Sequence, residues 1–293
     1  ASDWRTILVG GLGRGGRGYY ALDITVPASP KALWEFTDND LGYTYGSPQV
    51  AKLSNGTWAV MVTSGYNNIP NADGAAGDGV GRLYVLDALT GVQLASPAGE
   101  SPISTGVGNS TNPSGLAQIV AQVNNPKTDN TVDAVYGGDL LGNLWRFDVN
   151  GTVGASGYDA QLLAVLKDGD GVRQSISTKP EVAKLPNGEG VMVYVGTGRF
   201  LDRADAATTS DASKQQSVYG IKDPRSTGST PATAIFDNPG DSPRVTGTSS
   251  KGFVRQIHTL IDCPAGTPVY ICLPGEKVFS TTNNPVNYAS DNG

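Results

Sequence analysis

The stretch "PQVAKLSNGTWAVMV", residues Pro48 to Val62, decides the fold because the chain contains it twice. It returns as "PEVAKLPNGEGVMVYV", residues Pro180 to Val195, at an offset of 132 residues. Each copy has an apolar run, a polar turn with Asn-Gly, and a second apolar run, which is the pattern of a β-hairpin. Two copies of one hairpin predict a repeat architecture.

A third hairpin of the same shape lies between these two copies. It reads "GLAQIVAQVNNPKTDNTVDAVYGG", residues Gly115 to Gly138, with an Asn-rich polar turn between its two alternating runs. The true period of the repeat is therefore about half of the 132-residue offset.

A second element follows the hairpins and has its own pattern, an aromatic residue, then apolar residues, then Asp. The four aspartates are 64, 61 and 75 residues apart. An Asp at the end of a strand can accept backbone N–H bonds in the turn that follows, so we expect these residues to close the strands. The four segments are "GRGYYALDIT" (Gly16–Thr25), "GRLYVLDALTG" (Gly81–Gly91), "GNLWRFDVNG" (Gly142–Gly151) and "QSVYGIKDP" (Gln216–Pro224).

Repeats of this length, built from short strands, are typical of propeller blades. We therefore predict an all-β fold, a modified β-propeller of antiparallel blades, as one domain over residues 1–293. The blade repeats cover about residues 4–224, and residues 225–293 form an irregular C-terminal blade and tail. Blades bury their faces only against neighbouring blades, so four visible units imply either a larger ring, of which this segment is an incomplete part, or an atypical closure.

The composition supports strands over helices and argues against nucleic acid. Of the 27 acidic residues, 22 are Asp, which prefers turns to helices. The net charge is −6, and no run of Lys and Arg occurs, so we expect no nucleic-acid partner. No apolar stretch approaches the length of a membrane span, and we expect none. The chain starts at Ala1 without Met, which suggests a processed or trimmed segment.

The two cysteines, Cys263 and Cys272, are nine positions apart in "CPAGTPVYIC". A hairpin with a Pro-Gly turn could close this separation into a disulfide, which would indicate an oxidising compartment. Two free buried cysteines, as in many cytosolic proteins, are the alternative.

The motifs of catalysis are poorly represented, and we predict that the protein is not an enzyme. "GGLGRGGRG" fits the dinucleotide pattern G-x-G-x-x-G, but it is followed by "YYALDIT" and not by a helix, so a glycine-rich β-turn is the better interpretation. His258 is the only histidine, which leaves no ligand cluster for zinc, and no G-x-S-x-G motif is present. Pairs such as Asp38 and Asp40 could serve a glycosidase, but they arise by default in a chain with so many turn aspartates.

One loop has the spacing of a calcium site. Of every second position from 125 to 133, four carry oxygen-bearing side chains: Asn125, Asp129, Thr131 and Asp133. This spacing is typical of a loop that wraps around a hard cation such as calcium. Lys127 occupies one of the ligand positions, and its ammonium would repel a divalent ion. The loop is thus a degenerate calcium site with four candidate ligands, or a hairpin turn.

At "VDAVYGGDLLGNLWRFDVNG", residues Val132 to Gly151, the chain resembles the C-terminal propeller domain of the type IV pilus tip adhesin and biogenesis family, of the PilY and PilC type. The resemblance continues through "WRTILVGGLGRGGRGYYALDIT", "SGYNN", "ISTKPEVAKL" and "YVGTGRFL", in the same order over about residues 4 to 224.

This resemblance implies a non-enzymatic assembly factor and adhesin that supports pilus biogenesis. It implies export through the periplasm to the outer cell surface or the pilus tip, with minor pilins and a host or abiotic surface as partners. In that family a calcium loop precedes "YVYAGDL"-like text, which maps onto Asn125, Lys127, Asp129, Thr131 and Asp133. Retention of Asp129 and Asp133 keeps calcium a candidate cofactor, whereas Lys127 departs from the pattern and argues against a calcium-switched function.

Two other functions stay open. "GRLYVLDALTG" also resembles the repeats of quinone-dependent dehydrogenases, although those enzymes usually carry a disulfide of adjacent cysteines and a larger ring. A plain secreted propeller scaffold is the third hypothesis.

Overall fold

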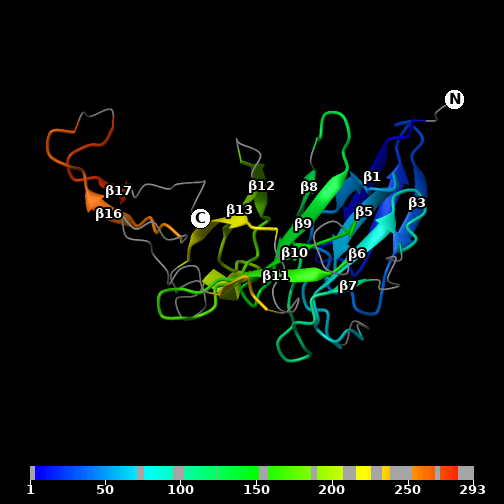
Figure 1. Ribbon diagram of the computed structural model, residues 1–293, viewed down its shortest axis with the longest axis horizontal. Helices are drawn as coiled ribbons and strands as arrows, with labels where there is room; N and C mark the ends of the chain where they lie inside the picture. The colour runs from blue at the N-terminus through cyan, green and yellow to red at the C-terminus, as the bar shows by residue number, and fades with distance from the viewer. Residues whose placement is uncertain are drawn as a thin grey trace.

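Four small sheets, made mainly of consecutive antiparallel strands, form the body of the molecule (Figure 1). The computed structural model describes residues 4–70, 76–94, 102–123, 125–151, 158–185, 190–206, 216–225, 233–237, 253–267 and 271–282. Within these residues the only helical element is a short 3-10 turn, η1 (Arg203–Ala206). The all-β prediction is confirmed.

Each sheet corresponds to one blade of the sequence repeat. Blade one contains β1 (Ile7–Gly11), β2 (Tyr19–Asp23) and β3 (Lys31–Phe36). Blade two contains β4 (Gln49–Lys52), β5 (Trp58–Thr63), β6 (Arg82–Asp87) and β7 (Ile103–Ser104). Blade three contains β8 (Ile119–Val123), β9 (Val132–Gly138), β10 (Asn143–Phe147) and β11 (Ala160–Val165). Blade four contains β12 (Glu181–Lys184), β13 (Val191–Gly196) and β14 (Val218–Asp223).

The three hairpins predicted from the repeat are present in the structure at the predicted residues. The two copies of the deciding stretch are β4–β5 and β12–β13, and the third hairpin is β8–β9. In blades two and three the order within the sheet is the order along the chain, so each blade is a meander. The glycine-rich segment between β1 and β2 is a hairpin connection, with Gly13 at φ 58°, and not the start of a helix.

The four aspartates of the second motif hold the turn after their strand, which is the second strand of blade one (β2) and the third strand of the other three blades (β6, β10 and β14). Asp87 Oδ1 accepts hydrogen bonds from the backbone N–H groups of Leu89 and Thr90, at 3.0 and 2.9 Å. Asp23, Asp148 and Asp223 accept equivalent bonds from residues two or three positions further along. The predicted role of the motif is confirmed.

Three hydrophobic cores lie between the four blades. Because successive side chains of a strand point to opposite faces, a central strand feeds the cores on both of its sides. In β5, Met61 enters the core shared with blade three, and Val60 enters the core shared with blade one. In β10, Trp145 faces blade two and Leu144 faces blade four. Each blade is thus stabilised by its neighbours, as the repeat predicts.

Two elements lie beyond the meanders. β15 (Phe236–Asp237) pairs in parallel with β11, on the outside of blade three, which the sequence did not predict. β16 (His258–Asp262) and β17 (Lys277–Thr281) form a two-stranded hairpin, coloured orange to red at the far left of Figure 1.

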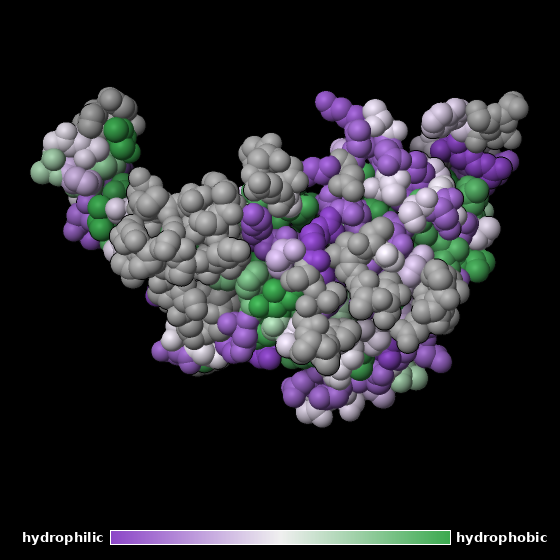
Figure 2. Space-filling view, in the orientation of Figure 1, coloured by the Kyte–Doolittle hydropathy of each residue, from purple (hydrophilic) through white to green (hydrophobic). Residues whose placement is uncertain are grey.

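The disulfide joins Cys263 to Cys272 at the end of that hairpin, as one of the two hypotheses predicted. The hairpin carries exposed apolar side chains, including the cross-strand pair Leu260 and Phe279. Figure 2 shows hydrophobic residues, in green, on this element at the far left. His258 lies in β16 as a strand residue, with its Nδ1 2.9 Å from Thr281 Oγ1.

The described sheets form an arc and do not close on each other (Figure 1). Blade one stands at the right of the view and blade four at the left of the body. Among the described residues, no helix is long and apolar enough to cross a membrane.

Candidate functional site

The loop with calcium-like spacing is the connection between β8 and β9, and it stands at the top of the view in Figure 1. Its backbone forms a tight turn around one carbonyl group. The oxygen of Asn125 accepts hydrogen bonds from the N–H groups of Thr128, Asp129 and Asn130, at 3.2, 2.9 and 3.2 Å. Asn130 takes φ 60°, in the left-handed region that Asn tolerates better than most residues. The hairpin-turn interpretation is therefore realised in the backbone.

The carboxylate of Asp129 is engaged by a cation from another blade. Its Oδ1 lies 2.7 Å from Nζ of Lys52, the last residue of β4. Thr131 Oγ1 donates a second hydrogen bond to the same oxygen, at 2.8 Å. These two donors, Lys52 first, lower the pKa of Asp129 below its ordinary value. The side chain is half exposed, so solvent screens the pair.

The carboxylate of Asp133 is engaged by a different cation. Its Oδ2 pairs with Nη2 of Arg225, which follows β14 of blade four. The side chain of Asp133 is less exposed than that of Asp129, at 15% against 49%, whereas Arg225 and Lys52 are about equally exposed. The two acidic residues of the loop are therefore bound to opposite neighbours of blade three.

This arrangement does not fit a calcium ion. Calcium takes six to eight oxygen ligands that converge on one point. Here the two carboxylates each contact a different protein cation, Lys52 for Asp129 and Arg225 for Asp133, and Asp129 Oδ1 also accepts the hydroxyl of Thr131. Lys127 is exposed at the loop surface. Across the described ranges, no group of three or more His, Cys, Asp or Glu side chains is placed to hold a metal.

A neighbouring turn makes further polar contacts at the same end of the blades, which we call the rim. Asn150, in the turn after β10, donates from Nδ2 to the carbonyl of Val132 at 2.5 Å. Its Oδ1 accepts the N–H of Ser54, in the turn between β4 and β5, at 2.9 Å. The loop thus belongs to a set of turns from blades two and three that contact one another.

The buried ionisable groups near this site form ion pairs and hydrogen bonds that join strands of two blades. Arg146 of β10 and Asp223 of β14 form an ion pair at 2.6 Å, with side chains 1% and 0% exposed. The hydroxyl of Tyr136 donates to the other oxygen of Asp223 at 2.7 Å, and burial raises the pKa of this tyrosine. The pair joins blade three to blade four inside the protein.

Asp139, in the "GGDL" segment, is a second buried carboxylate. Burial raises its pKa, while donors from Trp145, Asn143 and Leu141 oppose that rise. Its two oxygens accept four hydrogen bonds at 2.9 Å, from Leu141 N, Asn143 N, Asn143 Nδ2 and Trp145 Nε1. A carboxylate so fully bonded holds the turn between β9 and β10 in place.

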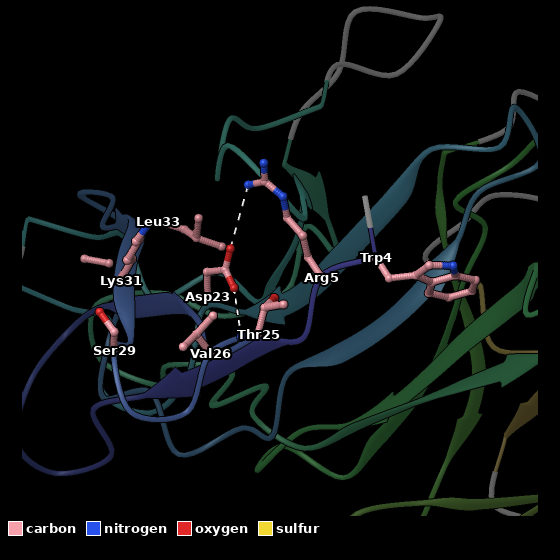
Figure 3. Close-up of a pocket in the computed structure, with 9 residues that line it drawn as sticks. Trp4, Arg5, Asp23, Thr25, Val26, Ser29, Lys31 and Leu33 are labelled. Carbon is pink, nitrogen blue, oxygen red and sulfur yellow. Dashed lines mark hydrogen bonds and ion pairs between the residues drawn. The ribbon is translucent and has the colours of Figure 1, made fainter. Parts of the chain in front are cut away.

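A depression of about 610 Å³ lies on blade one (Figure 3). Asp23 is flanked there by Arg5 and Lys31, with Arg5 Nη1 3.8 Å from its Oδ2, and Trp4 points away from the carboxylate. The N–H and hydroxyl of Thr25 lower the pKa of Asp23, and Arg5 and Lys31 add to this effect. The depression is open to solvent, and its single carboxylate is used in these contacts.

The spacing of the loop predicts its four candidate residues but not the two cations that contact Asp129 and Asp133. Lys52 could have been noticed, because the repeat places a lysine at the end of the first strand in "PQVAKL" and again in "PEVAKL". Arg225 carries no such signal, since it lies just beyond the last recognisable motif.

The fold and the repeat define this chain as a modified β-propeller built from blades of about sixty residues. Comparison with known proteins then gives the family. Residues 1–241 match the family described as the PilY1 beta-propeller domain. The chain belongs to that family.

Relatives and a solved structure agree with the family. The type IV pilus biogenesis factor PilY1 of Pseudomonas aeruginosa strain PAO1 is 33% identical over 312 residues, which covers 99% of this chain and 24% of the relative. A PilY1 homolog of Xylella fastidiosa is 34% identical over 248 residues, 75% of this chain and 15% of the homolog. The crystal structure of the P. aeruginosa PilY1 C-terminal domain matches with a TM-score of 0.68 at 27% identity, covering 97% of this chain and 55% of that chain. This chain therefore spans about a quarter of the length of its PilY1 relative in strain PAO1.

Proposed function

We propose that this propeller is part of a non-enzymatic pilus biogenesis factor that supports type IV pilus assembly and attaches cells to surfaces. The observation that carries the proposal is the family match over residues 1–241, in a chain whose relatives are named type IV pilus biogenesis factors. The location is the outer cell surface or the pilus tip, reached through the periplasm, and the disulfide of the C-terminal hairpin is consistent with export. Minor pilins and a host or abiotic surface are the partners.

The geometry supports a binding role over a catalytic one. The buried carboxylates Asp139 and Asp223 each accept several hydrogen bonds, and these bonds join strands and blades. Rim loops on a rigid stack of sheets are a common way to present a recognition surface. The exposed apolar residues of the β16–β17 hairpin, such as Phe279, add a second surface of this kind.

The test is an in-frame deletion of residues 4–224 from the gene in the source organism, with surface pili counted by electron microscopy. We expect fewer pili and weaker attachment than in the parent strain. A strain carrying Lys127→Met serves as the control, because this exposed side chain makes no contact with the two loop carboxylates. Unchanged piliation together with unchanged attachment would remove the proposal.

Assembly and adhesion can be separated with the purified chain. Retention of the chain on coated beads or plastic measures adhesion without pili. If pili are lost on deletion and the chain still fails to bind any tested surface, the assembly role stands and the adhesive role falls.

A further inference from the structure

The β8–β9 loop is the point where blade three meets cations from both of its neighbours. Asp129 contacts Lys52 of blade two, and Asp133 contacts Arg225 of the segment that follows blade four. Both acidic residues lie in or beside one hairpin turn, between Asn125 and the second residue of β9. A single turn therefore links three blades by charge.

Lys52 is held at this place by its backbone as well as by its charge. Its N–H donates to the carbonyl of Asn130 at 3.0 Å, and Lys52 and Thr131 form an isolated parallel β-bridge. Since the backbone already fixes the start of the side chain, Nζ loses less conformational freedom when it contacts Asp129.

Arg225 is positioned in a similar way. Its N–H donates to Asp223 Oδ1 at 2.9 Å, and its Nη2 lies 3.4 Å from Gln122 Oε1 of β8. Asp223 is itself fixed by the buried ion pair with Arg146. The residue whose guanidinium binds Asp133 is therefore itself hydrogen-bonded to the buried Arg146–Asp223 pair, which joins blades three and four.

The protein's own basic side chains already neutralise the acidic side chains of the loop, which disfavours the binding of a metal cation. Lys127, Lys52 and Arg225 are basic, and Asp129 and Asp133 are acidic, so these five side chains carry a net charge of one positive. A calcium ion would have to break two ion pairs and enter a region of like charge. Calcium prefers several carboxylates around it.

We propose that Lys52 and Arg225 take the place of a calcium ion in this chain. They close the β8–β9 loop and hold blade three to both neighbouring blades without a metal. The loop keeps the spacing of a calcium site, and protein cations neutralise its carboxylates.

The first test measures the purified chain after treatment with EDTA. Calcium is titrated calorimetrically, and thermal unfolding is followed in EDTA, in calcium and in magnesium at equal ionic strength. We expect no saturable calcium binding below about 1 mM, the weak end of protein calcium sites. We also expect the three unfolding midpoints to agree within about 1 °C. Micromolar calcium binding, or a midpoint that falls in EDTA and recovers only with calcium, would overturn the proposal.

The second test removes each cation while keeping its aliphatic length. Lys52→Met and Arg225→Met should each lower the unfolding midpoint by about 2 to 4 °C, and calcium should not restore it. Lys127→Met is the matched control, because it removes one positive charge from the same loop and breaks neither pair. If Lys52→Met and Arg225→Met unfold at the same temperature as Lys127→Met, the two cations do not hold the loop and the proposal fails. Should a variant fail to fold, the titration of the unaltered chain still decides.

Discussion

Asp129 and Lys52 are 77 positions apart in the chain, and their contact exists because two adjacent blades bring β4 and the β8–β9 loop together. The spacing of oxygen-bearing residues in the loop describes only one side of that contact. The chemistry of a residue pattern therefore depends on which charges the fold places opposite it, and here they are the charges of lysine and arginine.

The loop can be converted toward calcium binding by changing two residues. Lys127→Asp adds a carboxylate at the missing ligand position, and Lys52→Met frees Asp129. We expect the double variant to bind calcium at least about tenfold more tightly than the unaltered chain, with Lys127→Asp alone in between, because charge and ligand count both change in favour of the ion. Titration calorimetry measures this. An unaltered chain that already binds tightly, and to the same extent as the variants, would mean that Lys127 and Lys52 do not oppose calcium.

The buried pair of Arg146 and Asp223 should be far more sensitive to substitution than a surface pair. Asp223→Asn leaves a buried guanidinium without its counter-charge, and we expect a loss of about 3 kcal/mol in the free energy of unfolding. Asp237→Asn is the control, since its pair with Lys167 is exposed and should contribute less than about 0.5 kcal/mol. Urea unfolding of both variants gives the comparison, and equal losses would show that burial does not set the energy of the inner pair.

The ion pair between Asp78 and Arg82 in blade two should depend on pH in the acid range. Its two oxygens each accept a bond of 2.7 Å from Arg82, which lowers the pKa of Asp78 to about 2. A lowered pKa means that the carboxylate stabilises the fold above its unfolded pKa and loses that contribution as the pH falls through about 2. Because Asp78 is half exposed, we expect only about 1 kcal/mol. The difference in unfolding free energy between the unaltered chain and Asp78→Asn should be full at pH 5 and shrink toward pH 2; a constant difference would contradict the assignment.

At the scale of single elements, the strands were largely predictable and their outermost partners were not. The hairpins β4–β5, β8–β9 and β12–β13 follow from alternating apolar residues and turn chemistry, which are local signals. The pairing of β15 with β11 joins residues some seventy positions apart through two residues each, which is too short for any pattern to reveal. In the loop, the candidate oxygens could be found from spacing, but Arg225 could not, because its contact depends on how blade four packs on blade three.

The β16–β17 hairpin should depend on its disulfide, because a two-stranded hairpin alone is marginal in water. Replacing Cys263 and Cys272 by Ser should cost about 2 to 3 kcal/mol of loop-closure stabilisation. We expect faster amide hydrogen exchange in β16 and β17, and unchanged exchange in β9 and β10 of blade three. Exchange that is equally slow with and without the bridge would show that other contacts hold the hairpin.

At the scale of the whole molecule, three inter-blade cores and one set of rim turns join the four blades into an arc, from which loops and a hairpin project. The repeat in the sequence predicted the blades and their mutual burial, since each unit needs a neighbour. That residues 1–293 form one domain stays a prediction. Packed blades that present exposed loops are a common scaffold for contacts with other proteins or with surfaces.

The measurement that tests pilus association most directly is the location of the protein in fractionated cells. An antibody raised against the purified chain is applied to sheared pili, to the remaining cell envelopes and to cytoplasm, from the parent strain and from a strain that lacks the major pilin. We expect the protein to be found with the sheared pili of the parent and to be lost from that fraction when pili are absent. A protein that remains in the cytoplasm, or whose amount in the sheared fraction does not depend on pili, would contradict it.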